Sequence, residues 1–178
     1  MAQVTEDLVF NEEHSSDGVS NWNNTTANNG NFGTISGTDD FIIFGLTNLS
    51  QTPTSIISIQ YFADVFSGAG ATMVIQHEFL NSSNTQLYTE NEGYSTDVEN
   101  QVSGTVRTTS DGSTAWTEND INTLRVKLTQ LAGVGTGTAT CDHFFVRVKY
   151  NVADPVAGLI KLNSGKIKLN SGLVKIIA

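Results

Sequence analysis

The sequence has one cysteine, two prolines and few charged side chains, and each scarcity excludes a class of protein. Cys141 has no partner for an internal disulfide, so stability must come from packing or from assembly with other copies. Charged residues make up 15% of the 178 residues, too few for a coiled coil or a charge-driven disordered chain. No apolar run approaches the roughly 18 residues that span a bilayer. We therefore expect no membrane partner.

Positive charge is missing from a long stretch of the chain. Residues 1–106 contain 13 acidic residues and no Lys or Arg, whereas residues 107–178 hold all nine cations. Either the strands interleave and mix these charges, or an acidic body and a basic end favour head-to-tail contact between copies. The net charge of −9 disfavours a nucleic-acid partner, because phosphates would be repelled.

The amino end lacks the basic start of a signal peptide, since Glu6 and Asp7 are its first charged side chains. We therefore expect the protein to be made and first kept in the cytoplasm.

Small polar residues are abundant, and helical periodicity is almost absent. Thr, Ser and Asn supply 55 residues and Gly another 16. Alternating or β-branched runs bounded by Gly, Asn and Ser predict strands. These runs cover residues 4–10, 41–44, 55–66, 72–80, 85–89, 102–108, 124–128 and 144–149. We read residues 11–38 as loops and short edge pieces, with a tight turn at Asn29-Gly30. Strands separated by short polar turns predict an all-β, antiparallel β-sandwich.

Two shorter patterns complete this prediction. Residues 118–123 could form a helical turn, with Thr117 as its cap. Within residues 55–66, the alternation predicts that Ile57, Ile59, Tyr61 and Ala63 share one face of their strand.

The last 25 residues contain a seven-residue repeat. Leu-Ile-Lys-Leu-Asn-Ser-Gly at 159–165 is followed by Lys-Ile-Lys-Leu-Asn-Ser-Gly at 166–172 and by a third apolar run. Alternating apolar and Lys residues closed by Asn-Ser-Gly predict a strand-turn repeat, a short β-meander too small to fold alone. It must pack on the sandwich or on a neighbouring subunit. The residues predicted for an intersubunit contact are Leu159, Ile160, Lys161, Leu162, Ile167, Lys168, Leu169, Val174 and Ile176.

These patterns divide the chain into three parts. Residues 1–36 form an N-terminal strand and an Asn/Gly-rich loop segment that could serve as an anchoring arm. Residues 37–153 form the sandwich body, and residues 154–178 form the strand-turn repeat.

The chain offers little catalytic chemistry. Cys141 and His143 lie two apart in a predicted strand, so they share a face with Asp142 opposite, and their parallel side chains do not suit a nucleophile pair. A zinc site would need two more ligands of matching type, and the sequence has no Cys-x-x-Cys motif and no second His pair. We therefore expect no enzyme, no catalytic residue and no cofactor. Asp39 and Asp40 are calcium candidates, because hard cations favour clustered oxygen ligands.

Three aromatic residues are candidates for glycan contact. Trp22, Trp116 and Tyr94 could stack on sugar rings if they are exposed, and core packing is the alternative for each.

One stretch resembles a known family. Ala-Trp-Thr-Glu-Asn-Asp-Ile-Asn-Thr-Leu-Arg-Val at 115–126, a Gly/Thr-rich loop and Cys-Asp-His-Phe-Phe-Val-Arg-Val-Lys-Tyr at 141–150 resemble the closing half of a jelly-roll module of tailed-bacteriophage virion proteins. Gly-Thr-Asp-Asp at 37–40 is similar to an earlier motif of these modules, and terminal strand-turn repeats also occur in such proteins.

The resemblance covers about half of the chain and implies a jelly-roll-like sandwich located in the virion. The implied function is that of a capsid decoration or cement subunit, a trimer bound to identical subunits and to other virion proteins. Two alternatives stay open. One is a tail or head-fibre component, and the other is a lectin-like, carbohydrate-binding adhesion module whose partner is a surface glycan.

Overall fold

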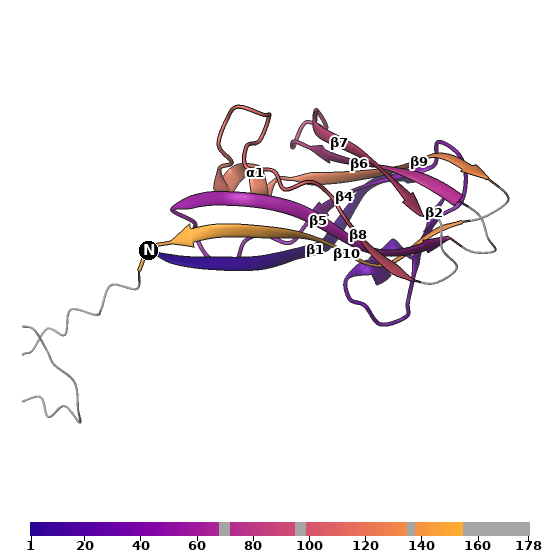
Figure 1. Ribbon diagram of the computed structural model, residues 1–178, viewed down its shortest axis with the longest axis horizontal. Coiled ribbons are helices and arrows are strands. Elements are labelled where there is room, and N and C mark those ends of the chain that lie inside the picture. The colour runs from indigo at the N-terminus through magenta and orange to yellow at the C-terminus, as the bar shows by residue number, and fades with distance from the viewer. Residues whose placement is uncertain (68–71, 95–98, 135–137, 155–178) are drawn as a thin grey trace, which may run out of the picture.

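Two antiparallel β-sheets pack face to face with the hydrophobic core between them (Figure 1). The computed structural model describes residues 1–67, 72–94, 99–134 and 138–154. The strand-turn repeat and its predicted intersubunit contacts lie outside the described residues. An antiparallel β-sandwich is therefore confirmed, while its C-terminal extension stays a prediction.

Ten strands, one 3₁₀ turn and one short α-helix follow in chain order within the described part. The strands are β1 (Ala2–Asp17), β2 (Val19–Ser20), β3 (Gly33–Ile35), β4 (Phe41–Leu46), β5 (Ser55–Ser67), β6 (Thr72–Leu80), β7 (Gln86–Tyr94), β8 (Asn100–Ser103), β9 (Arg125–Val134) and β10 (Ala139–Val152). The 3₁₀ turn is η1 (Trp22–Thr25) and the helix is α1 (Glu118–Asn122).

The two sheets share β1. In the first sheet β8, β5 and β10 are adjacent, and the far edge of β10 pairs with β1 and with β3, which pairs with β2. The second sheet has the order β1-β4-β9-β6-β7. Residues 2–9 of β1 pair with β10 and residues 10–17 with β4, with a register shift after Phe10 where the strand changes sheet.

The prediction for the amino-terminal segment was therefore wrong in part. Residues 11–17 are strand rather than loop, and β1 pairs within both sheets. The role of residues 1–36 as an anchoring arm stays a prediction. Residues 11–17 were missed as a strand because their side chains are mostly polar and exposed, which hides the alternation. Asn29-Gly30 also does not close a two-residue hairpin, because β2 and β3 are joined through η1 and a longer loop. Gly30 does adopt the positive φ of 77° expected of a turn glycine.

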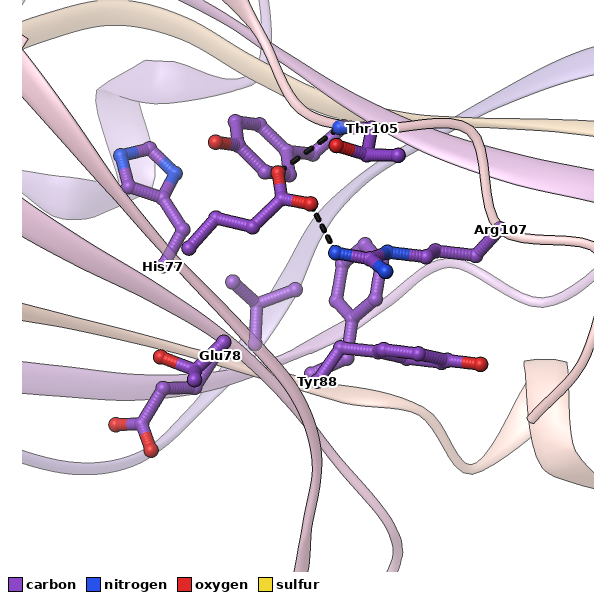
Figure 2. A pocket seen from close by; sticks show the side chains of 10 residues that line it. His77, Glu78, Tyr88, Thr105 and Arg107 are labelled. Carbon is purple, nitrogen blue, oxygen red and sulfur yellow. Dashed lines mark hydrogen bonds and ion pairs between the residues drawn. The ribbon is translucent and has the colours of Figure 1, made fainter. Parts of the chain in front are cut away.

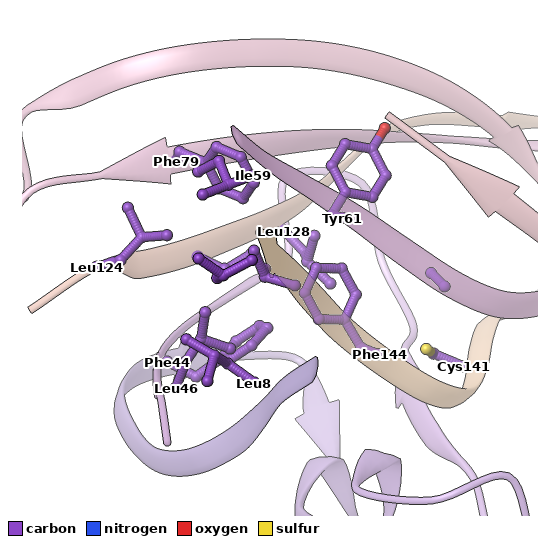
Figure 3. Close-up of a cluster of buried hydrophobic side chains, with 14 of the residues drawn as sticks. Leu8, Phe44, Leu46, Ile59, Tyr61, Phe79, Leu124, Leu128, Cys141 and Phe144 are labelled. Carbon is purple, nitrogen blue, oxygen red and sulfur yellow. The ribbon is translucent and has the colours of Figure 1, made fainter. Parts of the chain in front are cut away.

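Side-chain alternation places the core. In β10, Phe144, Val146 and Val148 point inward and are fully buried, whereas Arg147 and Lys149 point outward (Figure 3 shows part of this core). The predicted inward positions Ile59, Tyr61 and Ala63 of β5 are confirmed.

Ile57 is the exception in that predicted row. Ile56 is buried in its place, because the pairing of β5 with β10 shifts register between Lys149 and Tyr150.

The short helix begins where the sequence predicts. The Thr117 hydroxyl accepts a hydrogen bond from the Asp120 backbone N–H at 3.2 Å, and the Asp120 carboxylate accepts one from the Thr117 N–H at 2.9 Å. This reciprocal capping box holds the helix so that Ile121 is buried at one end of the core. Within the described ranges, no helix has the length and apolar character needed to span a membrane.

The strands mix the charges that the sequence separates. Cations from the second half of the chain pair with acids from the first half, as in Arg147 with Asp7, Lys127 with Glu78, and Arg107 with Glu90. For these residues the interleaved arrangement holds. The four lysines of residues 159–178 lie outside the described part, so the proposed basic end stays a prediction.

Candidate functional site

A polar groove crosses the outer face of the first sheet, over β1, β10 and β5. Its volume is about 470 Å³, which lies in the range of small-ligand sites. The residues that line it are Thr5, Asp7, Ser58, Gln60, Phe62, Val106, Arg147 and Lys149. Seven of these eight belong to the three strands, so a rigid scaffold positions them.

Strand register sets the floor of the groove as two rows of side chains. In one row, Arg147 of β10 lies opposite Asp7 of β1 on one side and Gln60 of β5 on the other. In the next row, Lys149 lies between Thr5 and Ser58. Because residues two apart in a strand share a face, both rows point away from the core.

Arg147 is fixed in this floor from two sides. Its Nε donates to Asp7 Oδ1 at 2.7 Å and its Nη2 to Asp7 Oδ2 at 2.8 Å, a bidentate pair. Its guanidinium carbon lies 4.9 Å from the centre of the Phe62 ring and 5.2 Å from that of Phe145. These two rings are themselves stacked, 5.0 Å apart with 9° between their planes.

This arrangement leaves Arg147 charged and oriented. The hydrogen bond to Asp7 raises the pKa of the guanidinium above its already high ordinary value. A guanidinium has five N–H donors, and Asp7 takes two of them. Three donors therefore remain for a ligand in the groove.

The segment after β8 forms the far rim of the groove. Residues 104–107 run along β5, with reciprocal backbone hydrogen bonds between Ile59 and Arg107. The Gln60 side-chain amide donates to the Gly104 carbonyl at 2.8 Å, which fixes the orientation of the amide. Val106 stands on this rim with 52% of its surface exposed, so the rim offers an apolar contact beside the polar floor.

A second, much smaller pocket lies between β5, β6 and β7 (Figure 2). Its volume is about 10 Å³, room for about one water molecule. In it the Tyr61 and His77 rings stack 4.4 Å apart. Glu90 closes it at the outside, accepting a hydrogen bond from the Thr105 N–H at 2.9 Å and pairing with Arg107.

The protonation states in this pocket follow from burial. Burial lowers the pKa of His77 to about 3, and burial together with the charges of Glu92 and Glu90 raises the pKa of Tyr61. Both side chains are therefore neutral near pH 7. Because Tyr61 and His77 are almost wholly buried, the pocket is part of the packing between sheets and has no room for a substrate.

A third cluster is acidic. Asp142 of β10 is fully buried, and its carboxylate accepts hydrogen bonds from the backbone N–H groups of Asn29 and Gly30. Nearby, Asp64 and Glu99 share the Asn28 side-chain amide as a donor. The pKa of Glu99 is raised by desolvation and by the charges of Asp142 and Asp64.

This acidic cluster has a structural role. Its donors come from the loop after η1 and from Gln101 of β8, so the cluster ties that loop and β8 to β10 and β5. Within the described part of the chain, no group of three or more His, Cys, Asp or Glu side chains is arranged to hold a metal ion.

Two of the three aromatic residues predicted for glycan contact are buried. Trp22 and Trp116 are only 4% and 3% exposed, so both rings belong to the core and offer no face for a sugar. The Tyr94 side chain lies outside the described residues. The two tryptophans therefore follow the alternative prediction, core packing.

The calcium candidates also lie apart from the groove. Asp39 is exposed and has a φ of 69°, while the Asp40 carboxylate lies against Gly18 and Gly37. Neither residue joins a metal-ligand group within the described ranges.

Cys141 and His143 do not form the simple alternating pair that the sequence predicts. The pairing of β10 with β5 shifts register between them, so Cys141 and Asp142 are both buried while His143 is half-buried. The His143 Nδ1 atom lies 3.8 Å from Asp64 Oδ2. Burial, followed by the charges of Asp64 and Asp142, raises the pKa of the Cys141 thiol well above its ordinary value. The thiol is therefore protonated and enclosed.

Sequence reasoning missed the groove residues, although one signal was present. The alternation of Phe144, Val146 and Val148 with Arg147 and Lys149 marks an outward face that carries two cations. The sequence does not reveal the register that places Asp7 beside Arg147.

Comparison with known proteins supports the fold. No protein-family profile matches the chain, and no curated protein matches its sequence. Among solved structures, the chain is similar to a truncated AlyQ with CBM32 and alginate lyase domains, at 16% identity and a TM-score of 0.50. That alignment covers 88% of this chain and 36% of the AlyQ chain, so the chain spans about a third of it.

Two looser similarities accompany it. One is to the CBM36-1 domain of a multidomain xylanase from the hindgut metagenome of Trinervitermes trinervoides, with 10% identity, a TM-score of 0.40 and coverage of 83% of this chain and 96% of that one. The other is to the CBM32 of AlyQ in complex with 4,5-unsaturated mannuronic acid, with 15% identity, a TM-score of 0.43 and coverage of 76% and 98%. At such low identity, the likeness establishes the fold alone, a jelly-roll-type β-sandwich.

Proposed function

We propose that the protein is a non-catalytic carbohydrate-binding β-sandwich and that its glycan lies in the groove over β1, β10 and β5. The observation that carries this proposal is the guanidinium of Arg147, which Asp7 and two stacked phenylalanine rings hold in place. It lies in a groove whose lining also includes the hydroxyl groups of Thr5 and Ser58, the amide of Gln60, the ammonium group of Lys149 and the apolar side chain of Val106. A carbohydrate-binding module was an alternative prediction from the sequence, and the similarity of fold to a chain with a CBM32 domain agrees with it.

The chemistry of the groove suits a sugar. Sugar hydroxyls both donate and accept hydrogen bonds, and they need partners fixed in position. Arg147 supplies donors, the Gln60 amide is oriented by Gly104, and the Thr5 and Ser58 hydroxyls can serve in either direction. The apolar C–H face of a sugar ring can rest on exposed Val106 at the rim.

The same groove is poorly equipped for catalysis. Glycoside hydrolysis ordinarily needs two carboxyl groups on either side of the scissile bond. Asp7 is the one carboxylate among the eight lining residues, and both of its oxygens are bound to Arg147. A binding role therefore fits these residues better than bond cleavage does.

The test is affinity electrophoresis of the full chain through gels that contain soluble polysaccharides, both neutral and acidic. We expect at least one polysaccharide to retard the wild-type protein. Retardation should disappear in the double variant Asp7→Leu/Arg147→Leu, which removes the pair without leaving a lone charge. A matched control is Glu13→Leu/Arg125→Leu, an acid and a base removed from the other sheet. Normal migration of the wild type in every gel would overturn the proposal.

The virion structural role remains a second candidate, carried by the strand-turn repeat at residues 159–177 and by the resemblance of residues 115–126 and 141–150. In that role the protein would be a trimeric decoration or fibre subunit. Light scattering of the full chain and of a chain ending at Asp154 tests it. Loss of an oligomer on truncation supports the role, and two monomers of equal stability would contradict it.

A further inference from the structure

We infer that the groove takes an acidic glycan, one whose sugar units carry a carboxylate, and that Lys149 binds this carboxylate. The inference rests on the proposed glycan-binding function and deepens it by naming the class of sugar.

Lys149 stands out among the cations of the described residues. Arg107, Lys127 and Arg147 each form an ion pair with a carboxylate, and Arg125 donates to the Asn84 side chain at 2.7 Å. Lys149 has neither an ion pair nor a side-chain hydrogen bond with any described residue. An exposed lysine is ordinary by itself, so its position must carry the argument.

The position is inside the groove. Lys149 is two residues from Arg147 on the same face of β10, and in its own row it lies between Thr5 and Ser58. Both neighbours are small hydroxyl residues that cannot neutralise an ammonium group. A ligand lying along β10 would therefore meet the oriented Arg147 donors and then a positive charge without a counter-ion.

The balance of hydrogen-bonding groups points the same way. The groove's one carboxylate, Asp7, is already neutralised by Arg147, whereas Lys149 contributes one uncompensated positive charge and three N–H donors. The lining thus offers more donors than acceptors. A carboxylate on the sugar supplies both the acceptors and the missing negative charge.

The net charge of the chain narrows the class of acidic ligands further. At −9 the protein as a whole repels dense polyanions, so one lysine would not hold a highly sulfated polymer or a nucleic acid. A uronic-acid polymer carries a single charge per sugar unit, which one ammonium group can match.

The experiment compares probes that differ in this one charge. Isothermal titration calorimetry measures the affinity of the full chain for three kinds of saccharide. The uronates are oligogalacturonate and alginate oligomers. The uncharged probes are fully methyl-esterified oligogalacturonate and neutral xylan and mannan oligomers, and the sulfated probe is dextran sulfate. The variants are Lys149→Gln and, as the matched control on the other sheet, Arg125→Gln. We expect a uronate oligomer to bind best and Lys149→Gln to weaken it about tenfold, the size of one charge-assisted hydrogen bond. Arg125→Gln should bind like the wild type.

The possible outcomes distinguish a failure of the acidic-glycan inference from a failure of the proposed glycan-binding function. Equal affinity for charged and neutral oligomers, or no effect of Lys149→Gln, overturns the acidic-glycan inference while glycan binding stands. Preference for dextran sulfate over every uronate also overturns it. If none of the saccharides binds, the proposed function itself has failed.

Discussion

Arg147 and Asp7 lie 140 residues apart in the chain and form a two-point hydrogen-bonded pair across the contact of β1 with β10. The first strand and the last described strand thereby each supply part of the groove floor, beside β5. Phe62 and Phe145 lie under the guanidinium, so its plane is set by packing as well as by the acid. The groove is thus assembled only when the two ends of the sandwich sequence pair.

Replacement of Arg147 by lysine tests whether the flat guanidinium is needed. Lysine keeps the charge but loses the bidentate pair with Asp7 and the stacking on both rings. We expect Arg147→Lys to lower glycan affinity at least several-fold. The melting temperature should change little, because an ion pair this exposed contributes only about 0.2–1 kcal/mol. Calorimetric titration measures the affinity and thermal unfolding measures the melting temperature. Unchanged affinity would show that glycan binding does not need the flat guanidinium group of Arg147.

Replacement of Gly104 by alanine tests the close approach of the rim to Tyr61. A Cβ at this position would lie 2.1 Å from Tyr61 Cε1. Tyr61 cannot easily move away, because its ring stacks on His77 and Phe144. We expect Gly104→Ala to destabilise the fold by about 1–3 kcal/mol, the cost of overpacking. Urea unfolding measures this, and the matched control is Gly93→Ala, because a Cβ at Gly93 meets no atom within 4 Å and the backbone there is not in the left-handed region.

Much of the fold was predictable because alternation survives wherever one strand face is buried. The strand at 72–80 coincides with β6, and the cap at Thr117 is where the sequence places it. Prediction failed where the alternation is interrupted or hidden. Register shifts exchange Ile57 for Ile56 and separate Cys141 from His143, and polar residues obscure the second half of β1.

The groove was less predictable than the fold. Its polar residues are ordinary surface types, and what makes them a site is the register of three strands that are distant in sequence. The aromatic residues chosen from the sequence, Trp22 and Trp116, are large enough to be needed in the core. The rings that do contact Arg147 are Phe62 and Phe145, whose role depends on stacking across β5 and β10.

His77 should make stability depend on pH. Burial depresses its pKa from 6.5 to about 3, so the folded protein binds fewer protons than the unfolded chain between these values. Its contribution is therefore complete above pH 6.5 and is lost as the pH falls toward 3, by about 1.4 kcal/mol per pH unit. We expect His77→Phe to have a shallower fall in unfolding free energy between pH 6.5 and 4.

The comparison for His77 uses urea unfolding at several pH values. At pH 8 the free energies of unfolding of the wild type and of His77→Phe differ only through packing. The free energy at pH 8 therefore serves as the reference for each protein. Parallel curves for His77→Phe and the wild type across the acid range would contradict a neutral, buried His77.

Cys141 should be chemically inert in the folded protein. Its side chain is 1% exposed, and burial raises the pKa of the thiol, so neither access nor thiolate is present. We expect a thiol reagent to react with Cys141 only in denaturant. One equivalent of the reagent should then be consumed per chain. Reaction of the native protein at the rate of a free thiol would mean that this part of β10 is open.

The most direct test of the central claim is a two-dimensional amide NMR titration of the full chain with the tightest-binding oligosaccharide of the panel. We predict that the largest shifts fall on the Arg147 side-chain Nε–H and on the backbone of Thr5, Gln60 and Lys149. Saturable shifts confined to a different face, such as the recess around His14 and Asn122 at the other sheet, would contradict glycan binding in the groove.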